Sequence, residues 1–96
     1  MKYGLSDETY NKIKEIVKKY SNHEFNIFGS RARGEYKVNS DIDIAIMDFV
    51  DNTEKLKIKN EFDLLDIPYT IDLIFTQDIT KKEFLESIKR ESVKYE

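Results

Sequence analysis

The run DIDIAIM, residues 41–47, constrains the fold of this chain more than any other segment. Isoleucine occupies every second position of the run. In an extended strand, alternate side chains point to opposite faces, so the isoleucines share one face and both aspartates share the other. The run therefore predicts a strand with one apolar and one acidic face, in a sheet that needs helices to cover its apolar side.

The segments around this run alternate between helical and strand patterns. Ser6 is a good N-cap for a first helix. Asp51 with Glu54, and Thr80 with Glu83, form two capping boxes that open later helices. Expected helices span residues 5–20, 30–36, 51–65 and 80 onward, with Val93 and Tyr95 extending the last; expected strands span residues 24–28, 41–47 and 69–76. This order predicts an α/β (α+β) fold, a small mixed sheet of three or four strands flanked by helices, and leaves the strand order open.

Length and composition exclude several classes of protein. The 96 residues suit a single domain, which we expect to span residues 1–96. The chain has no cysteine, which excludes disulfides, thiolate metal sites and cysteine nucleophiles. No signal peptide and no apolar run of transmembrane length is visible, so a cytoplasmic protein without membrane contact is expected. The net charge of −3 makes direct nucleic-acid binding an unattractive interpretation.

Three aspartates are the candidate catalytic metal ligands. Asp41 and Asp43 leave the same face of one strand, with Cα atoms about 6–7 Å apart. Asp72 lies in the apolar segment YTIDLIF, where an unpaired carboxylate is costly to bury. Magnesium takes one or two carboxylates together with substrate phosphates, and two such ions can clamp both oxygens of a phosphoryl displacement. The three carboxylates form one cluster if their strands are neighbours, which the sequence does not establish.

A glycine-serine turn and two arginines precede these carboxylates. Gly29 permits positive φ or a close approach of the backbone, and Ser30 is expected to cap the short helix that follows. Unpaired N–H groups at a helix start suit a phosphate, and Arg31 and Arg33 can form bidentate pairs with phosphate oxygens. The stretch therefore combines a phosphate-binding end with a metal-recruiting end.

Each feature taken alone also has an ordinary structural explanation. A Gly-Ser pair is often a plain strand-to-helix corner, and an alternating strand often has one solvated face. Arg31 and Arg33 could be surface charges, and Asp72 could be a hydrogen-bonded strand residue. His23, the only histidine, is expected to be a solvated loop residue. Tyr36 is expected to be a core or rim residue, and contact with a base at the nearby proposed site is the alternative.

The joint spacing of these features resembles a known signature. Gly29-Ser30, then ten residues, then Asp41-Ile42-Asp43 resembles the GS-x10-DxD motif of the DNA polymerase β-type nucleotidyltransferase superfamily. The fuller string GSRARGEYKVNSDIDIAI resembles the minimal nucleotidyltransferases, many of which are antitoxins encoded beside HEPN ribonuclease toxins. Asp72 falls where that family carries its third carboxylate. The signature covers about a fifth of the chain, and we expect no second domain of the kind that larger relatives use to hold their acceptor.

This resemblance implies an ATP- and magnesium-dependent reaction. Such enzymes transfer AMP to an acceptor hydroxyl and release pyrophosphate, and for the antitoxins the acceptor is a tyrosine of the HEPN toxin. Ser30 would hold the β- and γ-phosphates, while Asp41 and Asp43 would bind two Mg²⁺ ions. Asp72 would bind the catalytic ion and help to deprotonate the acceptor. A homodimer is left open.

Two other functions are compatible with the same residues. The chain could be a non-catalytic antitoxin, a binding module that neutralises its partner sterically and keeps only a vestigial nucleotide site. It could also transfer a nucleotide to RNA or to a small molecule, although its acidic net charge makes RNA the less attractive acceptor.

Overall fold

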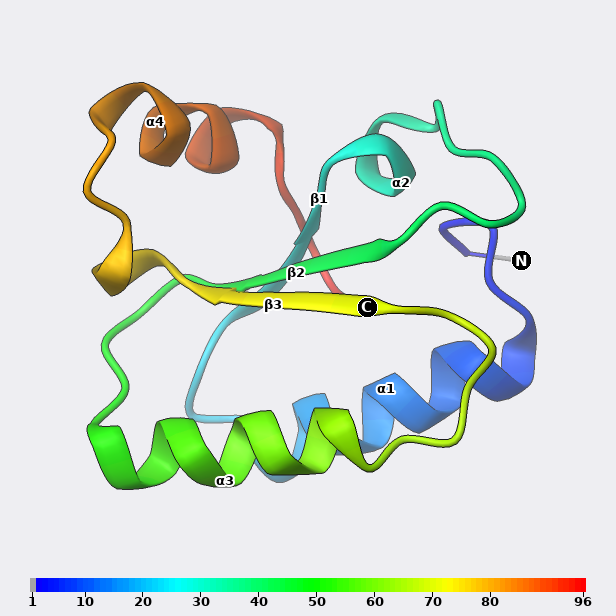
Figure 1. Cartoon of the computed structure of the whole chain (residues 1–96), viewed down its shortest axis with the longest axis horizontal. Coiled ribbons are helices and arrows are strands. Elements are labelled where there is room, and N and C mark those ends of the chain that lie inside the picture. Colours follow the sequence, from blue (N-terminus) through cyan, green and yellow to red (C-terminus); the bar gives the residue numbers. More distant parts are fainter. Residues whose placement is uncertain (1) are drawn as a thin grey trace.

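The computed structural model describes residues 2–96, and four strands of that range form one sheet at its centre (Figure 1). The elements in chain order are α1 (Asp7–Lys19), β1 (Phe25–Phe28), α2 (Ser30–Arg33), β2 (Ile42–Ile46), α3 (Asn52–Asp63), β3 (Ile71–Phe75), the short 3-10 helix η1 (Thr76–Asp78), α4 (Lys82–Glu91) and β4 (Val93–Lys94). The strand order is β3-β2-β1-β4. β1 is antiparallel to β2 and β4, whereas β2 and β3 are parallel. The expected mixed sheet flanked by helices is confirmed.

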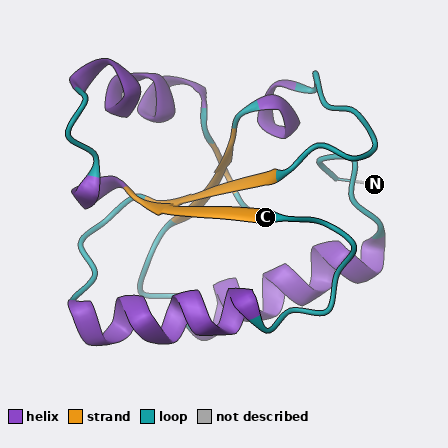
Figure 2. Ribbon diagram, viewed as in Figure 1, coloured by secondary structure: helices purple, strands orange, loops and turns teal. Residues whose placement is uncertain are grey.

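The helices form one layer on each side of the sheet. Figure 1 shows α1 and α3 below it and α2 and α4 above it, and Figure 2 shows the same layers by element type. We call the side of the sheet that α1 and α3 cover the lower face, and the side that α2 and α4 cover the upper face. α3 is the crossover that parallel pairing of β2 and β3 requires. Over residues 2–96, no helix combines the length and hydrophobicity needed to cross a membrane.

The lower face contains the hydrophobic core. The three isoleucines of β2 have no exposed surface, as the alternation of the run predicts. They belong to the same buried cluster as Ile13 of α1 and Ile58 of α3. Apolar surface removed from water at about 25 cal/mol per Å² makes this layer the main source of stability. The core thus fixes which side of β2 faces upward.

The expected caps of α1 and α3 are confirmed, whereas the expected cap of α4 is wrong. The Ser6 side chain accepts a hydrogen bond from the Thr9 amide, and the Asp51 side chain accepts one from the Glu54 amide. Thr80 does not cap α4, because that helix starts at Lys82 and Lys81 occupies the cap position without a side-chain bond. The capping-box pattern therefore placed the last helix too early.

The C-terminal segment is a strand and not a continuation of α4. Ser92 ends the helix in an extended conformation, and Val93 and Lys94 pair with β1. Tyr95 is then buried, its ring stacked on Tyr10 at 5.1 Å and its hydroxyl donating to the Tyr10 carbonyl at 2.9 Å. The expected helical extension through Val93 and Tyr95 is wrong, because pairing with the open edge of β1 and burial of a large ring outweigh local helix propensity.

His23 is also placed differently from the expected solvated loop position. Its side chain is only 8% exposed and lies between two carboxylates. Nδ1 is 3.1 Å from Asp48 Oδ1, and Nε2 contacts Glu54. Burial lowers the pKa of His23, but the hydrogen bonds and charges of Glu54 and Asp48 outweigh it, so the pKa is raised overall. The imidazole therefore ties the turn before β1 to the start of α3.

Candidate functional site

Two of the predicted carboxylates are brought together by the sheet. Asp43 of β2 and Asp72 of β3 are direct partners in the parallel register, and both point to the upper face. Neighbouring strands lie about 4.8 Å apart, so the two side chains leave the sheet side by side. Asp43 is half-buried and Asp72 is exposed. The adjacency of these strands, which the sequence left open, is therefore confirmed.

This pairing is electrostatically unfavourable in the absence of a cation. Like charges directly opposite each other destabilise a sheet, and a nearby carboxylate disfavours ionisation. Burial raises the pKa of Asp43, and the charges of Asp72 and Asp41 raise it further, while Arg31 and Arg33 act in the opposite direction. A divalent cation at this position would relieve the repulsion.

Asp41 lies immediately before β2 and is exposed. The Ile42 amide donates to the Thr70 carbonyl at 2.9 Å, which fixes this end of β2 to the segment entering β3. Asp41 is two residues from Asp43, so in an extended chain the two side chains share one side. All three predicted carboxylates are thus near the same end of the β2–β3 pair.

The glycine-serine turn is adjacent to Asp43. Gly29 has φ of +74°, and a Cβ atom at this position would overlap the Asp43 carboxylate. Only glycine allows the turn both this conformation and this approach. Gly29 itself occupies the cap position of α2, without a side-chain cap bond, and Ser30 is the first helical residue. The expectation that Ser30 caps the helix is wrong, although the serine still follows directly on the contact with Asp43.

Arg31 is a buried residue, so its interpretation as a surface charge is wrong. It is 2% exposed, and its guanidinium donates to the carbonyls of Ser40 at 2.8 Å and Tyr3 at 2.9 Å. The same group lies 5.1 Å from the ring centre of Tyr36 and 4.9 Å from that of Tyr69. The hydrogen bonds of Arg31 therefore hold the loop that leads into β2 in place, and the ring of Tyr36 packs against the guanidinium.

Arg33, two residues after Arg31, is exposed. Its partners are Glu35, at 3.4 Å, and Glu91 of α4, at 3.9 Å. Exposed pairs at such distances contribute little, about 0–1 kcal/mol. The Arg33 guanidinium is accordingly available to turn toward a ligand, unlike that of Arg31.

The donor chemistry suits a magnesium ion that arrives with its nucleotide. Within residues 2–96, no three or more His, Cys, Asp or Glu side chains are grouped closely enough to hold a metal ion by themselves. Magnesium does not need such a cage, because it binds through one or two carboxylates and completes its octahedron with phosphate and water. The opposed Asp43 and Asp72, with the raised pKa of Asp43, provide that smaller set.

The outer side of β3 is open. β3 is an edge strand of the sheet, and a cavity of about 380 Å³ lies along it. Its lining includes Phe62 of α3, Tyr69 and Asp72. Asp72 can therefore be approached from outside the sheet, whereas Asp43 lies between two strands.

Opposed carboxylates beside a glycine-serine turn are the kind of arrangement that phosphoryl transfer requires. Residues 11–94 match the family model described as "Polymerase beta, Nucleotidyltransferase", and the chain belongs to this family. The family expected from the GS-x10-DxD spacing is thereby confirmed. No curated protein matches the chain.

Solved structures show the same fold. A chain of the crystal structure of a toxin–antitoxin with AMP-PNP is 23% identical, with a TM-score of 0.65 over 91% of this chain and 72% of that one. A chain of the toxin–antitoxin MntA-HepT is 20% identical, with a TM-score of 0.58 over 95% of this chain and 72% of that one. Identities this low establish the shared fold and nothing finer.

Proposed function

We propose that the chain is a minimal nucleotidyltransferase domain, spanning residues 1–96, that transfers AMP from ATP to a hydroxyl of a partner protein. The partner is a HEPN-type toxin, the acceptor is a tyrosine, and the chain acts as its antitoxin. The observation that carries the proposal is the opposition of Asp43 and Asp72 beside Gly29 in a member of this family. The similarity to toxin–antitoxin structures, one determined with AMP-PNP, supports the choice of partner and donor. Because the reaction consumes ATP, the proposal also places the chain in the cytoplasm.

The residues divide the chemistry between them. Asp41, Asp43 and Asp72 would hold magnesium, which would neutralise the charge on the phosphates and on the oxygens of the displacement. The amides of the Gly29–Ser30 turn and the Ser30 hydroxyl hold the β- and γ-phosphates, and Arg33 turns toward them. Arg31 positions the loop before Asp41 and does not contact phosphate in this proposal, because backbone carbonyls use its donors.

The transfer itself is an in-line displacement. The acceptor oxygen forms a bond to the α-phosphorus, and the bond between that phosphorus and the bridging oxygen of the leaving pyrophosphate breaks. Asp72 accepts the proton of the acceptor hydroxyl. Its position on the edge strand, beside the cavity along β3, lets a residue of a second protein reach it.

A steric antitoxin is the second candidate, and it uses the same partner without the transfer. Apolar side chains are exposed at Val38 (90%), Phe49 (72%) and Leu64 (74%). They stand singly on different segments, and each is a side chain that a bound partner could cover. Such a contact alone could neutralise a partner without any transfer.

One experiment separates the two functions. The tagged chain and its Asp41→Asn/Asp43→Asn variant serve as bait in lysate of the source cells, with α-labelled ATP and magnesium. An Asp7→Asn/Glu15→Gln variant removes two exposed carboxylates from α1 on the lower side and is the matched control. Label on a co-purifying protein with wild type and control alone supports transfer. A partner retained equally by all three baits without label supports the steric antitoxin, and label with the Asp41/Asp43 variant contradicts the metal assignment.

A further inference from the structure

An exposed aromatic residue lies close to the carboxylates. Phe84, in the first turn of α4, keeps 44% of its surface exposed. Its ring meets that of Phe28 edge to face, with centroids 6.4 Å apart and planes at 72°. A phenyl ring that packs edge to face on Phe28 and still keeps nearly half of its surface exposed offers apolar surface to a ligand.

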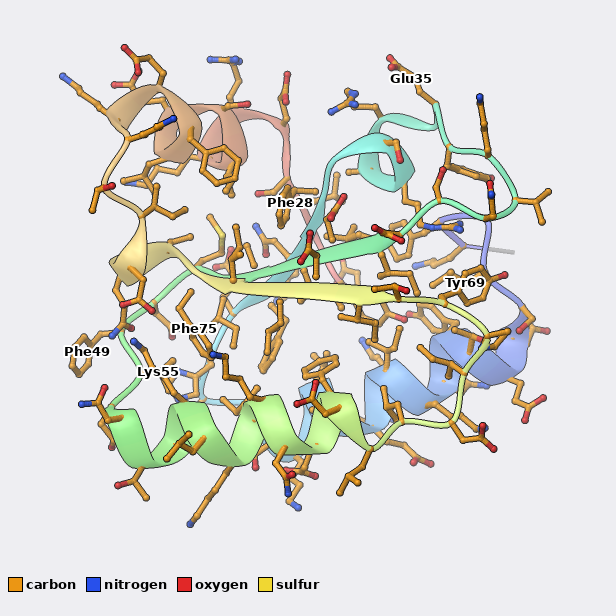
Figure 3. All side chains as sticks on the ribbon, viewed as in Figure 1. Phe28, Glu35, Phe49, Lys55, Tyr69 and Phe75 are labelled. Carbon is orange, nitrogen blue, oxygen red and sulfur yellow. The ribbon has the colours of Figure 1, made fainter. Side chains whose placement is uncertain are left out.

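Phe28 links this surface to the site. It is the register partner of Asp43, which in turn is the partner of Asp72, so the three residues form one row across the sheet. Their side chains share the upper face, and Figure 3 shows Phe28 in the space between α2 and α4. Gly29, which contacts the Asp43 carboxylate, follows Phe28 in the chain. A ligand with phosphates at the turn therefore has an aromatic pair on the α4 side of it.

We propose that Phe84, supported edge-on by Phe28, is the platform on which the base of the nucleoside triphosphate stacks. The inference rests on the proposed function, since it places the base of the same nucleotide. Bases stack on aromatic side chains through their π-faces, and such stacking tolerates any base. Phenyl rings have no hydrogen-bonding group, so the platform distinguishes bases by ring size. Purine nucleotides bind more tightly than pyrimidine nucleotides, and ATP and GTP bind alike.

The simpler explanation is that the two rings only pack α4 onto the sheet. In that case a substitution at Phe84 would lower the stability of the fold. It would not weaken binding of the nucleotide more than binding of the phosphates alone. The exposed fraction of Phe84 makes a fold-preserving substitution practicable. The two explanations therefore differ in a binding measurement.

The test compares two probes by calorimetry in the presence of magnesium: an ATP analogue with a non-cleavable α–β bridge, and inorganic tripolyphosphate. Phe84→Ala should weaken binding of the analogue on the order of ten- to a hundredfold and leave tripolyphosphate unchanged. Phe84→Tyr, which keeps a stacking ring, should bind the analogue like wild type. Phe49→Ala is the matched control, because Phe49 is exposed near the start of α3, away from Phe28 (Figure 3).

Each other outcome overturns the inference in a recognisable way. Unchanged affinity of Phe84→Ala for the analogue removes the platform, and an equal loss for both probes assigns Phe84 to packing. A wild-type chain that binds neither probe contradicts the proposed function, and the platform with it. A wild-type chain that binds both probes, with unchanged affinities in Phe84→Ala, leaves the function standing and overturns the platform alone.

Discussion

The two faces of the sheet are made by the same strands and differ in what they contribute. On the lower face, Ile44 and its neighbours are fully buried against α1 and α3. On the upper face, one residue away along β2, Asp43 opposes a second carboxylate and has a raised pKa because of burial and like charge. Burial of apolar side chains on the lower face stabilises the fold, whereas the opposed carboxylates on the upper face destabilise it. Because the side-chain period of a strand is two residues, the buried isoleucines and the Asp43 carboxylate come from opposite faces of the same strand.

The largest effect is expected on the lower face. Ile44→Ala removes a fully buried side chain and leaves a cavity, so the free energy of unfolding should fall by about 2–5 kcal/mol. Leu56→Ala on α3, where 70% of the side chain is exposed, should change it by less than about 0.5 kcal/mol. Urea unfolding followed by circular dichroism measures both. Similar losses for the two variants would remove the distinction between core and surface.

The next effect tests a residue of the upper layer that behaves like a core residue. Arg31→Lys loses the planar fork that satisfies buried carbonyls, and the free energy of unfolding should fall by about 1–3 kcal/mol. Arg33→Lys, two positions away and exposed, should leave stability within about 0.5 kcal/mol. Arg33→Lys should instead weaken binding of the ATP analogue, because the variant loses the proposed bidentate contact with phosphate. The reverse pattern, with loss of stability at Arg33, would contradict our assignment of the two arginines.

Asp43→Asn should raise stability at neutral pH and abolish transfer. The variant removes the repulsion from Asp72, a gain of up to about 1 kcal/mol. Because the folded pKa of Asp43 is raised above 3.8, the penalty is full above the folded pKa and disappears as pH falls below 3.8, and the gain should disappear with it. Thermal unfolding with and without Mg²⁺ measures this, and magnesium should stabilise wild type more than the variant. A destabilised Asp43→Asn at pH 7 would show that the carboxylate supports the fold.

The smallest effect concerns the imidazole that joins the turn before β1 to α3. His23→Gln removes a group whose folded pKa is raised above 6.5. The stability that His23 contributes is therefore fully present below pH 6.5 and lost as pH rises through the folded pKa. Urea midpoints of wild type and variant should converge as pH rises from 6.5 through the folded pKa of His23. A difference that grows with pH would mean that burial, and not the two carboxylates, controls the pKa of His23.

Local patterns predicted much of this molecule. The alternation of residues 41–47 predicted both faces of β2, and the Ser6 and Asp51 caps mark helices that the structure contains. The spacing from Gly29 to Asp43 predicted the family. In each case the signal depends on residues that are close together in the sequence, where strand period, capping and turn geometry act.

The features that sequence reasoning missed depend on distant partners. Arg31 is buried because carbonyls of Tyr3 and Ser40 surround its guanidinium, and nothing in the residues next to it shows this. His23 is enclosed by carboxylates from two later segments. Val93 joins the sheet because the edge of β1 is open to it. Phe84 comes near Asp43 only because the folded chain packs it on Phe28, the register partner of Asp43.

Under the proposed function, the parallel register of Asp43 and Asp72 would also connect the nucleotide supply to the lifetime of the protein. The two carboxylates are separated along the chain by the whole of α3, so they meet only in the folded state. A cation shared between them, with the phosphates it carries, would bind the folded chain and not the unfolded one. At a hundredfold excess over its Kd, such a ligand adds about 2.7 kcal/mol to stability. A fall in cellular ATP would then leave more molecules unfolded and open to proteases, so starvation would shorten the survival of this protein.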